Sequence, residues 1–408
     1  MQVKNTSLAT LVAIFASITA SFTSDLLMLS PVARVLAQST QTNTSEAKRL
    51  LDLCREDIRK KQYQAALKSC QQAVMSAQGM GDRSIQAKSL NNLGLAYQNT
   101  GSLQQALSDY QQALPIAQAI KERSLESKVL INLGKVANKL GDTAKAKASF
   151  EQALKIYQSI KDQKGGEENA LNGLGVAYYS LGNYERAIYY YNQSLTIART
   201  IGDRGGEAAS LGNLGMVYYS LGDYKQATDY QSQSLTIARA IEYRGGEAAS
   251  LGNLGLVYYS LGDYKRAIDY HSQDLAIARA IGDRFEEAKS LSNLGVAYNN
   301  LGDYKRAIDY LSESLEIKRA IEDKFGEAKS LGNLGVAYYS LGDYKRAIDY
   351  QSKSLTIARA IGDRFGEARS LSNLGEAYYS LKDYKEAIDY YNRSIDKCVR
   401  HGAVYFGE

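Results

Sequence analysis

The sequence contains few of the side chains that enzymes use for chemistry. Its 408 residues include two histidines, three cysteines and no tryptophan. An active site needs several reactive groups that converge, and His271 occupies a position that glutamine fills in two similar segments, at Gln231 and Gln351. No glycine-rich phosphate loop follows a strand-like segment. We therefore expect no catalytic site, no bound metal and no cofactor.

Long apolar runs are also scarce. An apolar-leaning stretch from Leu8 to Phe22 follows Lys4, but its length falls short of the roughly 20 residues that span a bilayer. A short apolar run after a positive charge, followed by small or branched residues at Val35–Ala37, is typical of a secretory signal peptide. We predict that residues 1–37 are this signal, that cleavage occurs near Ala37, and that the protein is exported to the periplasm or outside the cell, without a stable membrane span.

The charge balance is close to neutral. The chain has 49 Lys and Arg against 44 Asp and Glu, a net charge of +5. A nucleic-acid-binding domain usually shows a stronger positive excess. We therefore expect no nucleic-acid partner.

The sequence is rich in one repeated segment. The forty residues that follow Gly205–Arg244 repeat 32 of its positions, and a segment of this length that recurs buries its apolar face against its own neighbours. After a polar linker at 38–43, and before a tail at 405–408, we count nine units: 44–83, 84–123, 124–164, 165–204, 205–244, 245–284, 285–324, 325–364 and 365–404.

Each unit reads as a pair of helices. Leu214 and Tyr218 share one face of a helix because apolar residues recur with its 3.6-residue period. Gly222 can adopt the left-handed conformation that ends this first helix, and Asp223 can cap the second, which we expect to start near Tyr224. The first helix is expected to open near Gly206.

We expect close packing within each pair. The glycine of the first helix should contact a small residue of the second, as Gly255 with Ala267, so a larger side chain at Gly255 would overpack the pair.

These residues resemble the signature of the tetratricopeptide repeat, whose leucine, glycine, tyrosine, glycine, tyrosine and alanine fall on Leu214, Gly215, Tyr218, Gly222, Tyr224 and Ala227. Two positions depart from it, because Leu211 replaces a tryptophan and Arg239 a proline. The forty-residue unit is similar to those of Pins/LGN-type polarity adaptors and, less closely, of kinesin light chain. The resemblance, over 44–404, implies an all-α, right-handed solenoid of about nine antiparallel helix pairs.

The resemblance also implies a function. Such arrays are non-catalytic scaffolds whose first helices line a concave groove that binds a peptide or a protein segment, and groove asparagines of the adaptors contact the peptide. The candidate groove residues here are Asn92, Asn132, Asn213, Tyr219, Asn253, Tyr259, Asn293, Asn299, Asn333, Tyr339, Asn373 and Tyr379. The alternative interpretation is that the asparagines bond neighbouring units.

Positive charge gathers in the first three units on the same helical stripe. It includes Lys128, Lys135 and Lys139, together with Lys48, Arg55, Arg59 and Lys88. The equivalent positions in units five and six carry small or apolar residues, and charge returns at Lys289, Lys329 and Arg369. We hypothesise that the N-terminal end attracts an acidic segment of the partner. The alternative is a solvated face.

Cys54 and Cys70 lie at equal distances from Gln62 in the turn of the first pair. Residues equidistant from a turn are level in two antiparallel helices, so a disulfide is within reach. The alternative is two small buried thiols.

Two further functions stay open. An export signal before an array of repeats resembles bacterial, notably cyanobacterial, proteins in which the array precedes a caspase-like CHAT domain, so this array is alternatively a sensor whose catalytic domain is missing. Alternatively, similar units stack end to end, and the protein self-associates.

Overall fold

The structure, a computed structural model, describes residues 31–160 and 163–399, and consists there of α-helices without a strand. The predicted tail and most of the predicted signal peptide lie outside these residues. The chain divides into two bodies at Gly166 and Glu167, inside α8. We call them the first body and the second body.

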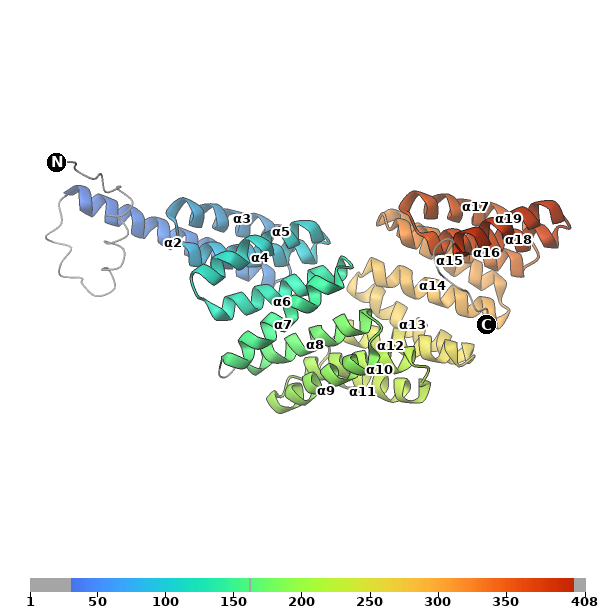
Figure 1. Ribbon diagram of the computed structural model, residues 1–408, viewed down its shortest axis with the longest axis horizontal. Coiled ribbons are helices and arrows are strands. Elements are labelled where there is room, and N and C mark those ends of the chain that lie inside the picture. Colours follow the sequence, from blue (N-terminus) through green and yellow to red (C-terminus); the bar gives the residue numbers. More distant parts are fainter. Residues whose placement is uncertain (1–30, 161–162, 400–408) are drawn as a thin grey trace. The chain divides into compact units, whose positions relative to one another are not determined.

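Within each body, consecutive helices lie side by side and pack in pairs (Figure 1). The helices of the first body are α2 (Pro31–Arg59), α3 (Tyr63–Met80), α4 (Arg83–Asn99), α5 (Leu103–Ala119), α6 (Arg123–Lys139) and α7 (Thr143–Ser159). The boundary helix is α8 (Lys164–Ser180). The second body continues with α9 (Tyr184–Ile201), α10 (Arg204–Ser220), α11 (Tyr224–Ala240), α12 (Arg244–Ser260), α13 (Tyr264–Ile281), α14 (Arg284–Leu301), α15 (Tyr304–Ala320), α16 (Lys324–Ser340), α17 (Tyr344–Ile361), α18 (Arg364–Ser380) and α19 (Tyr384–Val399). The prediction of an all-α repeat fold is confirmed.

Glycine and aspartate separate the two helices of a pair. Gly222 has φ +77°, the left-handed region that costs glycine little. The Asp223 carboxylate then accepts a hydrogen bond from the backbone N–H of Gln226 at 3.0 Å, which caps α11. The helix α11 starts at Tyr224, as predicted, whereas α10 starts at Arg204, two residues before the predicted Gly206.

The joints between pairs of the second body use the same device with two exceptions. Gly202 and Gly282 take φ of +72° and +71° at the ends of α9 and α13. Glutamate stands at this position in two joints, where Glu242 and Glu322 take φ of +55° and +58°. Left-handed backbone is unfavourable for a residue with a Cβ, so these two joints are strained.

The first helix starts earlier than the repeat. Helix α2 begins at Pro31 and passes through Ala37 and residues 38–43, the segment predicted as a linker. Among the described residues no helix combines the length and the apolar character that crossing a membrane requires.

The core of each pair is built from leucine and alanine. In the second body Leu211 and Leu214 of α10 are at most 1 % exposed, as are Ala227 and Ala238 of α11. Tyrosines of the paired helices also stack. Tyr218–Tyr230, Tyr258–Tyr270, Tyr298–Tyr310, Tyr338–Tyr350 and Tyr378–Tyr390 have ring centroids 5.2–5.4 Å apart.

The space above Gly255 holds a residue that the sequence did not indicate. A Cβ added at Gly255 would overlap the imidazole ring of His271. The equivalent glycines Gly215 and Gly295 face Gln231 and Leu311, and a Cβ on Gly295 would also lie 3.1 Å from the backbone oxygen of Ala307, the counterpart of Ala267. The long side chain one turn after the alanine therefore fills most of the space above the glycine.

Candidate functional site

The stripe predicted to bind a partner runs along the first helix of each pair. In α10 it contains Ala209 and Ser220, which are exposed, and Asn213 and Met216, which are half-buried. We call the stripe with these four positions, together with its equivalents in α2, α4, α6, α8, α12, α14, α16 and α18, the inner stripe. Within a body, the same stripe recurs on every second helix.

Two stripe asparagines bond to the preceding unit. The Asn132 amide donates to the Asn91 side-chain oxygen at 3.0 Å, and the Asn213 amide donates to that of Asn172 at 3.3 Å. At these two positions the structure has the contact that the alternative interpretation expects.

The asparagines of the four following units differ. Asn253, Asn293, Asn333 and Asn373 are half-buried, and their amides make no side-chain hydrogen bond to any residue that the structure describes. A carboxamide offers two donors and an acceptor, and polar groups withdrawn from water are normally bonded. These four amides therefore present unused hydrogen-bonding capacity on α12, α14, α16 and α18.

The stripe tyrosines mostly hold units together. Tyr219 shares a hydrogen bond of 3.0 Å with Ser260, Asn300 donates to the Tyr259 hydroxyl at 2.9 Å, and Ser380 donates to that of Tyr339 at 3.1 Å. Each bond joins first helices of successive units.

The last two candidates of this group differ from each other. Tyr379 is 57 % exposed. The side-chain oxygen of Asn299 is buried and has no hydrogen-bond partner among the described residues.

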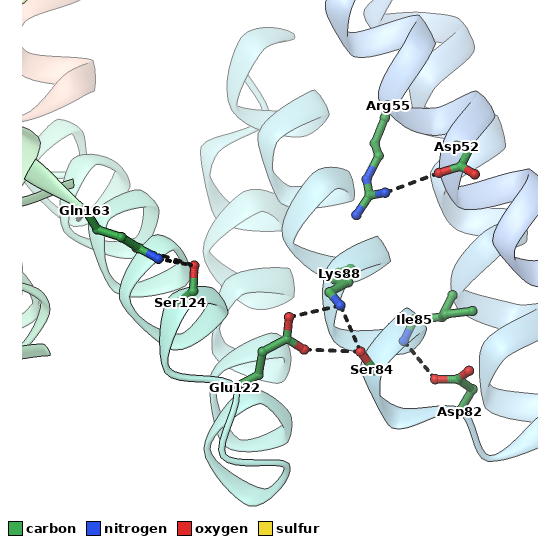
Figure 2. Close-up of polar contacts among 9 residues, drawn as sticks. All are labelled: Asp52, Arg55, Asp82, Ser84, Ile85, Lys88, Glu122, Ser124 and Gln163. Carbon is green, nitrogen blue, oxygen red and sulfur yellow. Dashed lines mark hydrogen bonds and ion pairs between the residues drawn. The ribbon is translucent and has the colours of Figure 1, made fainter. Parts of the chain in front are cut away.

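Carboxylates of the first body neutralise part of the predicted positive charge. Lys128, Lys135 and Lys139 are exposed on α6. Arg55 is bonded to Asp52 at 3.2 Å, and Lys88 contacts Glu122 at 2.9 Å (Figure 2). Arg59 pairs with Glu56 in the same way. The net positive surface of the first body is therefore narrower than the sequence indicates and centres on α6.

The joints between pairs hold buried carboxylates that the sequence analysis did not single out. Glu247 of α12 is 7 % exposed and accepts hydrogen bonds from Arg239 at 2.8 Å and from Arg244 at 2.9 Å. The bond from Arg239 and the nearby charge of Arg244 outweigh burial and lower the pKa of Glu247. Glu207, Glu287, Glu327 and Glu367 occupy equivalent places beside Arg199, Arg279, Arg319 and Arg359.

In one unit of the second body, two equivalent buried positions carry a histidine and an aspartate. His271 and Asp274 of α13 are 1 % and 0 % exposed, in place of Gln231 and Ser234. The Asp274 carboxylate accepts a bond from Ser290 at 2.7 Å. Burial raises the pKa of Asp274 to about 6 and lowers that of His271 to about 4. Within the described residues, no group of three or more His, Cys, Asp and Glu side chains is placed to hold a metal ion.

In the first body, Cys54 of α2 and Cys70 of α3 form a disulfide with Cα atoms 4.8 Å apart, and both residues are fully buried. The disulfide links α2 and α3 at the level that the equal distances of the two cysteines from Gln62 predict.

Comparison with solved structures gives distant relatives of the same fold. A Rap protein complexed with Competence and Sporulation Factor is 17 % identical, with a TM-score of 0.62, over 87 % of this chain and 98 % of that one. A signal transduction ATPase with a tetratricopeptide repeat sensor from Pyrococcus horikoshii is 17 % identical, with a TM-score of 0.64, over 83 % of this chain and 53 % of that one. Aspartyl phosphate phosphatase F from Bacillus subtilis is 14 % identical, with a TM-score of 0.57, over 89 % of this chain and 97 % of that one.

No curated protein sequence matches the chain. A family model does, at residues 85–159, 166–240, 246–320 and 326–397, which together make up well over half of the chain, and it describes the tetratricopeptide repeat. These matches cover most of the helix pairs described above. The chain therefore belongs to the tetratricopeptide repeat family.

Proposed function

We propose that the protein is an interaction scaffold that binds a peptide or an extended protein segment along the inner stripe of the second body. The observation that carries this proposal is the set of unbonded, half-buried amides at Asn253, Asn293, Asn333 and Asn373. They recur once per unit, and an extended backbone presents N–H and C=O groups at regular intervals that such amides bond. The Rap protein in the comparison is complexed with a factor, which agrees with this use of the fold.

The asparagines with structural bonds mark where this proposal does not apply. Asn213 is bonded to Asn172 within the second body, and Asn132 to Asn91 within the first. We therefore assign backbone recognition to α12, α14, α16 and α18 and not to α6 or α10.

The exposed lysines of α6 extend the proposal to the first body. Lys128 and Lys139 make no ion pair with any residue that the structure describes, and together with Lys135 they lie on one face of one helix. We propose that this face attracts an acidic part of the partner. Attraction of this kind accelerates association and weakens as salt is added.

A selection from a library of random displayed peptides tests the proposal. The wild-type protein should enrich defined peptides. A variant with Asn253→Ala, Asn293→Ala and Asn333→Ala should bind them at least about tenfold more weakly in fluorescence anisotropy, because each lost hydrogen bond contributes about 1 kcal/mol. Asn192→Ala with Gln233→Ala, exposed amides on α9 and α11, is the matched control. Peptides that bind the triple variant unchanged, or no enrichment, would contradict the proposal.

A further inference from the structure

Three phenylalanines are exposed at the start of successive first helices. Phe285, Phe325 and Phe365 are 60 %, 60 % and 58 % exposed, and each is the second residue of its helix, α14, α16 or α18. We call them the phenylalanine strip. All three lie in the second body, forty residues apart.

The fold does not require these side chains. Gly205 and Gly245 occupy the same position in α10 and α12, which start at the same place in their units and hold the same buried glutamate. Nor do those units require glycine, since a Cβ at Gly205 would meet only an Asp203 oxygen at 3.4 Å, an ordinary contact. Packing therefore does not explain the exposed side chains of Phe285 and Phe325, and exposed apolar groups on successive first helices indicate a contact surface.

Each phenylalanine is accompanied by a cation. Lys289, Lys329 and Arg369 follow the three phenylalanines by four residues and so lie beside them on the same helical face. In the three units with glycine, at Gly165, Gly205 and Gly245, the equivalent residues are Asn169, Ala209 and Ala249. The aromatic ring and the positive charge thus occur together in three units and are both absent from three.

Two of these cations lack an internal counter-charge. Lys289 pairs with Glu286 at 2.6 Å. Lys329 and Arg369 make no ion pair with any carboxylate in residues 31–160 and 163–399. The Arg369 guanidinium reaches back over α16, where one of its nitrogens is 3.6 Å from the place of a Cβ on Gly332. Burial, and then the charge of Arg369, lower the pKa of Lys329. Two like charges held on adjacent helices favour an anion between them.

We propose that the phenylalanine strip and its cations are a docking site for a peptide segment in which acidic residues alternate with large apolar ones. The apolar side chains would cover the rings of Phe325 and Phe365, and a carboxylate would lie between Lys329 and Arg369. This inference rests on the proposed function, because the strip borders the inner stripe of the same helices and specifies what the partner carries there.

A single-stranded nucleic acid would also combine stacking with negative charge. Its backbone, however, is bound by proteins through many cationic contacts, about 6 to 10 in typical duplex complexes, whereas the strip offers two cations without internal partners. The site therefore fits isolated carboxylates better than a continuous phosphate chain.

The test repeats the random-peptide selection with three further baits. One carries Phe285→Gly, Phe325→Gly and Phe365→Gly, the residues of the sister units. One carries Lys329→Ala and Arg369→Ala. The third transplants the strip into α10 and α12 with Gly205→Phe, Ala209→Lys, Gly245→Phe and Ala249→Lys. Circular dichroism verifies that each variant keeps its helices. We expect this result because the new residues occur at the same positions in sister units.

We expect wild-type selections rich in Asp or Glu beside Leu, Ile or Phe. Such peptides should bind the glycine variant at least about tenfold more weakly, since buried aromatic anchors dominate interfaces. They should bind the alanine variant about fivefold more weakly with reduced dependence on salt, and the transplant variant more tightly than wild type. Unchanged binding to both loss variants, or displacement by an oligothymidine strand rather than by acidic peptides, would overturn the inference.

The outcome separates the two proposals. Peptides that lose affinity in the asparagine variant but not in the strip variants leave the scaffold proposal standing and refute the docking site. No enrichment on wild type refutes both.

Discussion

The two bodies of the protein stabilise similar helix pairs by different means. The first body closes its first hairpin with the Cys54–Cys70 disulfide, and its Glu126 bonds Arg123 and Gln118. The second body repeats one arrangement, in which a buried glutamate receives an arginine from the preceding helix, as Glu247 does from Arg239. Where units are near copies, the same polar contact recurs every forty residues. Where the sequence diverges, the polar contacts differ from joint to joint.

A second difference lies inside the regular body. The pairs α10/α11 and α16/α17 bury a glutamine whose amide donates to a backbone carbonyl, Gln231 to Gly212 at 2.8 Å and Gln351 to Gly332 at 2.9 Å. The pair α12/α13 buries His271 instead. Near-identical units therefore differ in whether their core responds to pH.

The largest expected effect is the loss of stability in the first body when its disulfide is reduced. The disulfide closes a loop of sequence separation 16, which contributes about 3 kcal/mol in the chain-entropy account. Reduction should therefore speed amide hydrogen exchange in α3 about a hundredfold, the factor that this free energy corresponds to. Amides of α11 in the second body are the internal control. Equal exchange in α3 before and after reduction would show that the hairpin does not depend on the bond.

The next effect is a pH dependence of stability that distinguishes α13 from the equivalent helices of other units. The pKa of His271 is lowered to about 4, so the unfolded chain binds its proton more readily and stability falls as pH decreases from 6.5 toward 4. The pKa of Asp274 is raised to about 6, so the folded chain holds that proton more readily and stability falls as pH rises from 4 toward 6. The two dependences have opposite signs and nearly cancel in the wild-type protein.

Single substitutions by the sister residues should expose each dependence. Relative to wild type, the free energy of unfolding of Asp274→Ser should rise by about 2 kcal/mol between pH 4 and pH 6, because only the histidine term remains. For His271→Gln it should fall by about 2 kcal/mol over the same interval. Urea denaturation at the two pH values measures both. Parallel profiles for the two variants would contradict the assignment of these buried groups.

The smallest effect separates the strained joints from the relaxed ones. Glu242 and Glu322 adopt positive φ where Gly202 and Gly282 stand in other joints. Glu242→Gly and Glu322→Gly should each stabilise the protein by about 1 kcal/mol, the cost of left-handed backbone with a Cβ. Thermal unfolding checks this, with Glu316→Gly in the interior of α15, which should destabilise, as the control. A lower melting temperature for the joint variants would mean that the side chains make contacts worth more than the strain.

Much of the fold follows from the sequence because its signals are local and repeated. Gly222 and Asp223 specify the end of one helix and the start of the next through their own backbone and side chain, and the recurrence of a glycine at this turn in seven units reinforces the period. The part of His271 in the packing at Gly255 could not be predicted, because it depends on the length of a side chain outside the signature. Alanine matches the family signature, but the atoms nearest to a Cβ on Gly255 belong to His271.

The candidate site was less predictable because side-chain pairing is not periodic. Asn213 and Asn253 occupy the same repeat position, yet one finds Asn172 and the other finds no partner in the described residues. The difference depends on the residue 41 positions earlier, which is Asn172 for Asn213 but Gly212 for Asn253. Asn132, which also finds a partner, has Asn91 at that position. The exposed Phe285, Phe325 and Phe365 were overlooked because they coincide with no signature position. The available signal was the difference between each phenylalanine and the glycine at the same repeat position, Gly205 or Gly245.

The conserved spacing of the joint has an evolutionary consequence. Arg199 and Glu207 stand eight residues apart, as do Arg239 and Glu247. Removal of residues 205–244 would bring Arg204 next to Gly245, and would recreate the sequence and the eight-residue spacing of the original joint. Genetic recombination between units can therefore shorten or lengthen the array by forty residues without creating a mismatched joint. The number of units, and with it the length of the proposed binding surface, is free to change while the fold is kept.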